Sequence, residues 1–455
     1  MTTTYDPKDP VYFDEADVRD ELTRVYDLCH GCRLCFKFCT SFPTLFEMID
    51  KHDDQDAGRL TPAEQDQVVD ECFQCKLCYI NCPYIPELHE WNLDFPRLML
   101  RADAMQHANG IKSTRDKLTT QMMGRTDLLG TLATSTGSIA NKIVNSEPGS
   151  GIRKVVAKVT GVSPVRLLPP YAKQRFSTWF EKRAKITLTF TQRQGTQRQG
   201  TQRQGTQRQG KVTVFPTCLV EYQEPDIGKD LVKVYERNGI ECNNTDAGCC
   251  GAPWLHSGNV KEFTKIAEKN VKTLAAEVRS GTDIVVPQPT CSYIIKKDYL
   301  DYVVDPVARA DAELVAEHTY DAAEYLMKVH EADDTSLDTD FPGDTFESIT
   351  YHTPCHLRAQ NIGLKSRDLM KLTGAKIQLV QQCSGIDGMW GFRAGNEDIS
   401  VPVAEKLGAE IDKAGGDIVA GDCHLANTAI VEQTGRIPQH PLQVMARAYG
   451  IAEEP

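Results

Sequence analysis

The sequence lacks any long hydrophobic run. No window approaches the ~18 uninterrupted apolar residues typical of a membrane-spanning helix. The segment 1–22 is acidic and has no apolar core, so it does not resemble a secretory signal. We therefore expect a cytoplasmic protein, in which thiols stay reduced and closely spaced cysteines bind metal rather than form disulfides.

A nucleotide-binding fingerprint is also missing. No Gly-x-Gly-x-x-Gly follows a predicted strand, and no flavin or nicotinamide motif is recognisable. The chain is therefore expected to lack a dehydrogenase site of its own, which leaves open whether it is an enzyme or an electron-transfer subunit of one.

The charge is unevenly distributed. The net charge is −12, which argues against a nucleic-acid partner, yet basic residues outnumber acidic ones by about ten between residues 101 and 190. Such a segment fits an anionic membrane surface or an acidic partner subunit. A solvated helical linker is an equally simple explanation.

The sixteen cysteines are clustered: eight precede residue 83, none lies between 83 and 217, and eight follow. The first eight form two runs with ferredoxin spacing, Cys29-x2-Cys32-x2-Cys35-x3-Cys39 and Cys72-x2-Cys75-x2-Cys78-x3-Cys82-Pro83. In such runs three thiolates bind one cubane and the fourth binds the neighbouring cluster.

This spacing predicts two [4Fe–4S] clusters that together conduct electrons. Cluster 1 is assigned to Cys29, Cys32, Cys35 and Cys82, and cluster 2 to Cys72, Cys75, Cys78 and Cys39. Zinc sites and disulfides are the alternatives, but zinc usually takes separated pairs of cysteines rather than two tandem runs of four.

The predicted fold is α+β and multidomain. Residues 1–100 should form a helical, ferredoxin-like two-cluster domain, with Thr61, Pro62 and Glu64 starting one helix and Asp14 another. Residues 101–190 should be a basic helical linker. Residues 191–210 are four copies of Thr-Gln-Arg-Gln-Gly, which we interpret as a polar loop between strands at 186–190 and 211–215.

From residue 211 the pattern predicts a duplicated α/β module, at 211–330 and 345–455, separated by an acidic linker at 331–344. Strands are expected at 211–215, 283–286, 349–352 and 417–420. A cysteine follows each of these strands, at the sheet edge where ligands bind in open α/β sheets. These cysteines are Cys218, Cys291, Cys355 and Cys423.

The first module offers four thiolates at one sheet edge: Cys218, Cys249, Cys250 and Cys291. The adjacent pair cannot easily form a disulfide with each other, but both cysteines can bind an iron–sulfur core. Gly251 would let the backbone approach a bulky inorganic group. We expect a further cluster or metal here, with a set of buried thiols that merely pack as the alternative.

These motifs resemble a known family. The segments PTC, CCG and PTCSY, followed by YHTPCH, QCSG and GDCH, are similar to the duplicated CCG domain of heterodisulfide reductase-like iron–sulfur proteins. Together with the N-terminal cysteines, GRTDLLG and LLPPYAKQRFSTWF, the chain resembles the family of the iron–sulfur C subunits of anaerobic glycerol-3-phosphate dehydrogenase. The resemblance implies a hetero-oligomer in which a peripheral subunit on the inner face of the membrane carries electrons from a flavoprotein to quinone in anaerobic respiration.

The second module departs from the family pattern. Ser384 stands where a second cysteine is expected and Ala426 where the last one is, which leaves Cys355, Cys383 and Cys423 with His356 and His424 beside two of them. A cluster with one His or Ser ligand, a zinc site, or a module that has lost its metal remain open.

Two other functions compete with electron transfer. A heterodisulfide reductase-like subunit could reduce a disulfide at its CCG sites, although the incomplete second module speaks against this. A zinc-bound scaffold without redox activity is the other. The donor could equally be a lactate- or glycolate-type dehydrogenase, because related subunits serve those enzymes too.

Overall fold

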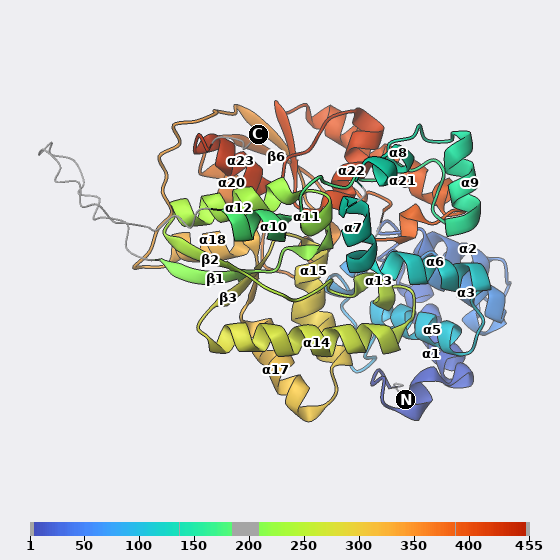
Figure 1. The fold of residues 1–455 in the computed structure, drawn as a ribbon. Coiled ribbons are helices and arrows are strands. Elements are labelled where there is room, and N and C mark those ends of the chain that lie inside the picture. Colours follow the sequence, from blue (N-terminus) through green and yellow to red (C-terminus); the bar gives the residue numbers. More distant parts are fainter. Residues whose placement is uncertain (1–3, 136, 184–208, 387, 452–455) are drawn as a thin grey trace, which may run out of the picture.

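The structure is a computed structural model that describes residues 4–135, 137–183, 209–386 and 388–451. Helices of the N-terminal and middle segments pack beside two separate sheets, each covered by its own helices (Figure 1). Among the described residues, no helix combines the length and the apolar character needed to cross a bilayer.

The N-terminal unit is helical, as predicted. The Asp14 carboxylate accepts a hydrogen bond from the backbone of Asp17 and caps the first long helix, and the predicted capping box of Thr61 and Glu64 is present. An apolar core formed by α1, α2, α3 and α5 holds the unit together. The elements are η1 (Pro10–Phe13), α1 (Glu15–Cys32), α2 (Ser41–Asp50), η2 (Ala57–Arg59), α3 (Pro62–Asp70), α4 (Leu77–Ile80) and α5 (Phe95–Ala108).

The boundary expected near residue 100 falls inside α5. Leu98, Met99, Ala102 and Met105 of this helix are all buried in the N-terminal core. The apolar face of α5 therefore belongs to the N-terminal unit, and the middle segment starts after Ala108.

The middle segment is helical and packs on the first CCG module. A Cβ at Gly124 would lie 2.3 Å from the Trp254 ring, and one at Gly130 would lie 2.4 Å from the Tyr222 ring. Only glycine allows these close approaches. The helices are α6 (Thr114–Gly124), α7 (Thr126–Ser135), α8 (Gly137–Val144), α9 (Gly151–Thr160) and α10 (Phe176–Lys182).

Two parallel sheets form the C-terminal half. The first has the order β2-β1-β3-β4 and the second β6-β5-β7, so β1, β2 and β3 correspond to β5, β6 and β7. This correspondence confirms the predicted duplication. The strands are β1 (Gly210–Val214), β2 (Ile240–Asn244), β3 (Asp283–Val286), β4 (Thr319–Asp321), β5 (Ser348–His352), β6 (Lys376–Val380) and β7 (Ile418–Gly421).

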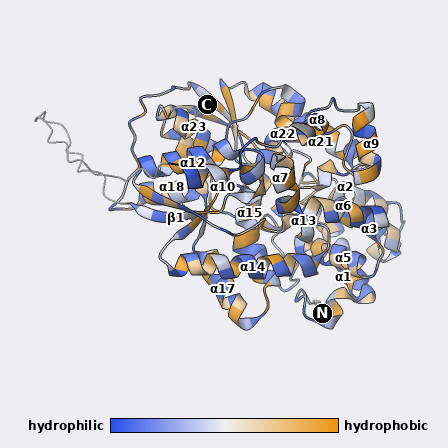
Figure 2. Cartoon of the chain, in the orientation of Figure 1, coloured by the Kyte–Doolittle hydropathy of each residue, from blue (hydrophilic) through white to orange (hydrophobic). Residues whose placement is uncertain are grey.

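Helices cover both sheets. The long α14 has one buried apolar face, and Figure 2 shows hydrophobic and hydrophilic residues alternating along the helix. The helices of the first module are α11 (Thr217–Tyr222), α12 (Pro225–Arg237), α13 (Ala252–Leu255), α14 (Val260–Arg279), α15 (Pro289–Tyr293), the π-helical η3 (Ile294–Asp298), α16 (Tyr299–Tyr302), α17 (Pro306–Glu317) and α18 (Ala322–Glu331). Those of the second module are α19 (Cys355–Ala359), α20 (Lys365–Lys371), η4 (Trp390–Phe392), α21 (Glu397–Ala414), α22 (His424–Thr434) and α23 (Pro441–Ala448).

Four strands lie within a residue of their predicted positions: β1, β3, β5 and β7. The strands β2, β4 and β6 were not anticipated. The strand expected at 186–190 and almost all of the Thr-Gln-Arg-Gln-Gly repeat lie outside the described residues.

Candidate metal centres

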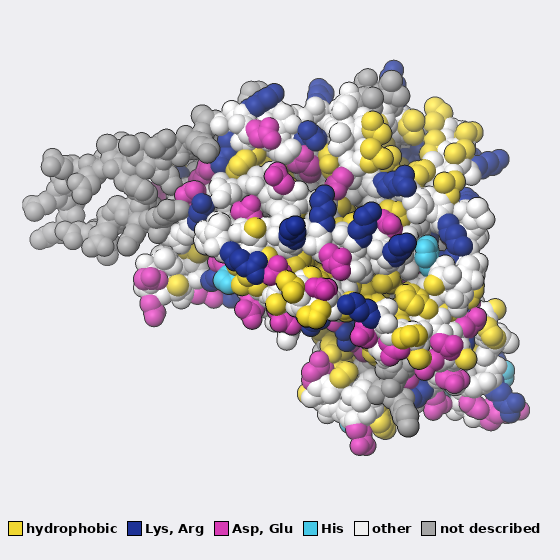
Figure 3. Space-filling view, turned by 60° about the horizontal axis from the view of Figure 1, so that its bottom comes forward, with side chains coloured by type: hydrophobic (Ala, Val, Ile, Leu, Met, Phe, Trp, Pro, Cys, Tyr) yellow, Lys and Arg dark blue, Asp and Glu magenta, His cyan; other side chains and the backbone are white. Residues whose placement is uncertain are grey.

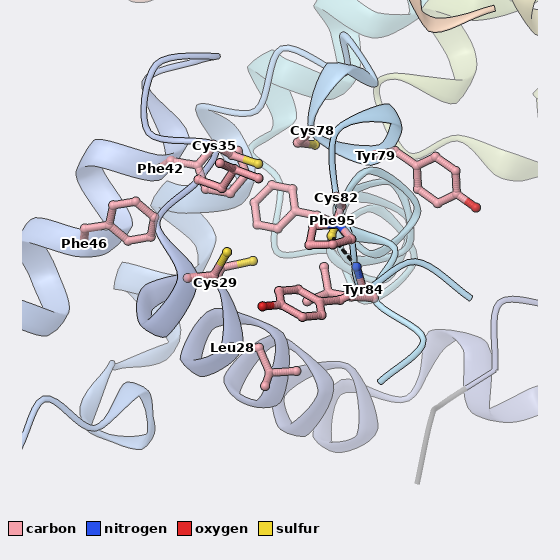
Figure 4. A pocket seen from close by; sticks show the side chains of 14 residues that line it. Leu28, Cys29, Cys35, Phe42, Phe46, Cys78, Tyr79, Cys82, Tyr84 and Phe95 are labelled. Carbon is pink, nitrogen blue, oxygen red and sulfur yellow. Dashed lines mark hydrogen bonds between the residues drawn. The ribbon is translucent and has the colours of Figure 1, made fainter. Parts of the chain in front are cut away.

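The first N-terminal group of thiols surrounds one apolar cavity. Cys29, Cys32, Cys35 and Cys82 line it together with Cys78. Figure 4 shows Cys29, Cys35 and Cys82 around this cavity, with the rings of Phe42 and Phe95 on its walls. Burial raises the pKa of Cys29 well above its ordinary value, and the neighbouring Cys35, Cys82 and Cys32 raise it further.

The second group lies next to the first. Burial raises the pKa of Cys39, with further increases from Cys72 and Cys75, and the pKa of Cys78 is raised by burial and then by Cys75 and Cys72. The four thiols assigned to each cluster are thus electrostatic neighbours, but the assignment of clusters to them stays a prediction.

Both N-terminal loops turn through left-handed backbone conformations at residues other than glycine. Arg33 has φ 53°, Gln74 has φ 52° and Lys76 has φ 62°. Such conformations are uncommon for these residue types and cost of order 1 kcal/mol or more each. The strain falls between the cysteines of each run, where it turns several thiols toward one centre.

The first CCG module brings its four predicted thiols together at the carboxyl ends of β1, β2 and β3. Cys249 lies between Cys218 and Cys250, and Cys250 in turn contacts Cys291. Hydrogen bonds from Cys218, from Cys250 and from the backbone of Gly251 hold the pKa of Cys249 below its ordinary value. One thiolate is therefore stabilised here even before a metal binds.

Three side chains from distant parts of the sequence hold the backbone of the Cys249-Cys250 loop. The backbone N–H of Cys249 donates to Asp127 Oδ2 (2.9 Å), Asn270 Nδ2 donates to the carbonyl of Cys249 (2.9 Å), and the Tyr299 hydroxyl donates to that of Cys250 (3.0 Å). These positioning residues were not anticipated from the sequence. Asp127 belongs to the GRTDLLG segment, so that segment was the one available signal.

In both modules a glycine with a left-handed backbone conformation directs its N–H at a cysteine sulfur. Gly251 has φ 87° and its N–H points at Cys249 Sγ (3.5 Å); Gly385 has φ 65° and its N–H points at Cys383 Sγ (3.4 Å). A Cβ at Gly385 would lie 2.4 Å from a backbone oxygen. The second module thus keeps the loop geometry although Ser384 replaces the adjacent cysteine.

In the second module Cys355, Cys383 and Cys423 line one cavity of about 290 Å³, together with Ser384 and Ala426. Gln288 Nε2 donates to Cys423 Sγ over 3.2 Å. The second module therefore places three thiols and the hydroxyls of Thr353 and Ser384 on the cavity wall, and the first module adds contacts.

The two candidate histidines differ. Both ring nitrogens of His356 are paired, with Thr290 Oγ1 and with the carbonyl of Gln74 (each 3.1 Å). His424 Nε2 is buried without a hydrogen-bond partner among the described residues. Burial lowers the pKa of His424 to about 4, so its imidazole is neutral and able to coordinate a metal. His356, however, lines the cavity that holds Cys355, Cys383 and Cys423, and His424 is not among its lining residues, so both remain candidates.

The three cysteine groups adjoin one another. Cys75 of the second N-terminal run lines the same cavity as Cys355, Cys383 and Cys423. His356 connects Gln74, next to Cys75, with Thr290, next to Cys291. The Trp390 Nε1–H donates to the carbonyl of Asp70 (2.6 Å), and its ring packs on Phe73.

The donor set fits sulfur-ligated clusters. Buried thiols with raised pKa values become thiolates when a positively charged metal group replaces their protons. Within residues 4–451, apart from those the structure leaves out, no three His, Cys, Asp or Glu side chains converge on a point to hold a single metal ion. Cubane ligands need not converge, because each binds a different iron.

One cysteine stands apart. Cys242 on β2 is buried in an apolar core, and burial raises the pKa of its thiol. It lies with valines and leucines rather than with the other thiols, so it serves packing.

Comparison with known proteins agrees with this geometry. The model of the cysteine-rich domain CCG matches residues 212–296 and 349–426. The C subunit of anaerobic glycerol-3-phosphate dehydrogenase from Escherichia coli K12 is 25% identical over 352 residues, which cover 76% of this chain and 81% of that protein. Lactate utilization protein A is 28% identical over 249 residues in Bacillus pumilus and 29% over 245 in Geobacillus kaustophilus. These alignments cover 52% of this chain and 96% and 95% of those proteins. Residues 212–296 and 349–426 are therefore two CCG cysteine-rich domains, in a chain that is similar over most of its length to the C subunit of a dehydrogenase.

Proposed function

We propose that this chain is an iron–sulfur subunit that carries electrons from a flavin-dependent dehydrogenase toward membrane quinone. The observation that supports this best is the continuity of the cysteine groups: Cys75, Cys355, Cys383 and Cys423 line one cavity, and Thr290 links that region to Cys291. An electron path requires redox sites that lie close together, and these cysteine groups share cavity walls.

The residues proposed to hold cofactors are the two N-terminal quartets, for two [4Fe–4S] clusters, and the thiols of the first CCG domain, for a further cluster. The clusters supply one-electron chemistry when bound. The protein's own part is to exclude water, to aim backbone amides at the sulfurs and to fix the spacing between sites. For the second domain, a cluster with His356, His424 or Ser384 as fourth ligand, zinc and loss of the metal remain candidates.

Electrons are proposed to enter at the first N-terminal group. Cys32 is exposed, and the large hydrophobic side chains of Leu34 and Phe36 beside it are more than half exposed. Exposed apolar side chains around a redox site fit a docking surface for a protein donor. The relatives carry the names of two different metabolic roles, glycerol-3-phosphate dehydrogenase and lactate utilization, so the donor is proposed only as a flavoprotein of this general class.

Helix α9 is proposed as the membrane contact. Ile152, Val155 and Val159 lie on one exposed face of this helix, and Lys154 and Lys158 lie beside them. On the face drawn in Figure 3, lysine and arginine side chains are interspersed with hydrophobic ones and with aspartate and glutamate. An exposed apolar stripe flanked by cations matches the surface of an anionic bilayer.

The test compares two cysteine variants of the anaerobically purified full chain. Cys250→Ser should lower iron content and remove one set of paramagnetic resonance signals while the N-terminal signals persist. Cys242→Ser is the matched control, since that buried thiol packs in an apolar core, and it should leave iron and spectra unchanged. A colourless protein with zinc, or one without reducible cluster signals, would overturn the proposed function.

Disulfide reduction is the second candidate, because a cavity opens beside the first CCG thiols. Turnover of a disulfide without any flavoprotein would favour it over electron transfer.

A further inference from the structure

An apolar cavity lies against the first CCG thiols. Its volume is about 250 Å³, and Cys218, Cys249, Cys250 and Cys291 form part of its wall. The middle segment and the second CCG domain supply the opposite wall, which includes Met122, Met123, Leu129, Leu168 and Phe392. The cavity is thus bounded by three parts of the chain and reaches the thiols directly.

Among the residues that the structure describes, no Asp, Glu, Lys or Arg side chain lines this cavity. A ligand that carries carboxylate or phosphate groups would lose its hydration there without gaining a counter-charge. The lining therefore selects for an uncharged, mostly apolar molecule, and it disfavours the charged thiol carriers that a disulfide reductase would bind.

Three polar atoms of residues in the cavity wall have no hydrogen-bond partner within the described parts of the chain. They are His256 Nε2, Gln223 Oε1 and Thr126 Oγ1, and all are shielded from solvent. Burial and the nearby Lys76 charge keep the pKa of His256 well below its ordinary value, so its ring is neutral. A neutral imidazole can donate one N–H to a ligand oxygen, and the Gln223 amide oxygen can accept from a ligand hydroxyl.

We propose that this cavity binds a quinone-class carrier, with its ring between the middle segment and the cluster proposed at the first CCG thiols, one ring oxygen at His256 and the other toward Gln223. The inference rests on the proposed electron-transfer function and names the place where the carrier would be held. A flat apolar ring with an oxygen at each end suits the apolar wall. One oxygen accepts from His256, and the other, as a hydroxyl of the reduced carrier, donates to Gln223 Oε1.

Helices α7 and α8 separate this cavity from solvent. Leu129 and Gly130 face the cavity, whereas the neighbouring Leu128 is 53% exposed. Val144 of α8 also lines the cavity, while Ile143 of the same helix is exposed. A lipid-soluble carrier would therefore meet apolar side chains on both the outer and the inner side of these helices.

The test is direct binding to the full iron-loaded chain under anaerobic conditions. The probe is 2-heptyl-4-hydroxyquinoline N-oxide, an uncharged quinone analogue whose own fluorescence is quenched on binding. We expect saturable quenching with the wild-type chain. Leu129→Trp should fill the cavity and weaken binding at least tenfold, whereas the matched control Leu128→Trp, one residue away on the exposed face, should bind as the wild type does.

A milder variant keeps the test valid if Leu129→Trp does not fold. Gln223→Leu removes one hydrogen-bond partner at similar volume and should weaken binding several-fold with unchanged iron content. No saturable binding to an iron-loaded chain, or equal binding by both tryptophan variants, overturns the quinone site while leaving the electron-transfer proposal standing. Displacement of the probe by an uncharged aliphatic disulfide but not by a short-chain quinone would also overturn it. Absence of cluster signals would instead refute the proposed function.

Discussion

At the scale of single residues, Lys76 is a buried cation within the second cysteine run of the N-terminal unit. It lies between Cys75 and Cys78, and its side chain is only 3% exposed. The ammonium donates to Gln74 Oε1 (3.1 Å). Burial lowers the pKa values of His256 and His356, and the Lys76 charge lowers them further. A buried cation next to a cluster of thiolates favours the reduced, more negative state of that cluster.

Lys76→Met should therefore lower the midpoint potential of one N-terminal cluster by an amount on the order of tens of millivolts, since ~59 mV corresponds to a tenfold change for one electron. A redox titration followed by paramagnetic resonance measures this shift. Lys37→Met is the control, because Lys37 follows Cys35 but is exposed, and solvent screens its charge. Equal potentials in the wild type and the Lys76 variant would show that this charge does not act on the cluster.

The sequence identified the thiols of the candidate sites but not the residues that support their loops. Cysteine spacing identified the thiols that the structure brings together, because the spacing of ligands in a run reflects local geometry. It could not identify Asp127, Asn270 or Gln288, whose contacts with the cysteine loops span 122, 21 and 135 positions of sequence. Nothing local to such a residue marks it as a support for a site.

At the scale of elements, the strands that were missed are all at sheet edges. β2, β4 and β6 lie at the ends of the orders β2-β1-β3-β4 and β6-β5-β7. What they share is the lack of a buried run: β6 has only one buried residue, Val380, and β2 and β4 have no two buried residues in succession, whereas the edge strand β7 has three. Central strands such as β1 and β3 carry three buried residues in succession and are therefore recognisable as apolar runs.

The close packing of α7 on α11 yields a test at this scale. Gly130→Ala should place a methyl group against the Tyr222 ring and destabilise the fold by roughly 1–3 kcal/mol, the usual cost of overpacking. Thermal unfolding measures the change. Gly151→Ala is the matched control, because no atom of the described residues lies within 4 Å of a Cβ at that position at the start of α9. A Gly130 variant as stable as the Gly151 variant would mean that α7 does not depend on this contact.

At the scale of the whole molecule, the middle segment does more than link two domains. It walls the cavity beside the first CCG thiols, and α9 places its apolar stripe on the outer surface. The basic excess of this segment can be counted in the sequence. Its packing on the CCG domain depends on Gly124, Gly130 and Trp254, and counting charges does not reveal such contacts.

Membrane association can be measured by pelleting the full chain with liposomes. Binding to vesicles that contain phosphatidylglycerol should fall as salt rises, because screening weakens the attraction of Lys154 and Lys158 to the headgroups. Val155→Glu should reduce binding several-fold, since it puts a negative charge in the exposed stripe. Glu147→Gln, outside this stripe, should bind at least as well as the wild type; binding that ignores both salt and Val155→Glu would exclude α9 as the contact.

The start of β1 has a practical consequence. Gly210, its first residue, lies at the opposite end of a parallel strand from Val214 and the loop that delivers Cys218. Gln209, just before it, pairs with the backbone of Gly239 and of Ser336 rather than with any part of the cysteine sites. A fluorescent label or an affinity handle attached near the start of β1 is thus at the end of the strand away from Cys218, and a chain immobilised on a surface there would keep its thiol-bearing end turned away from that surface.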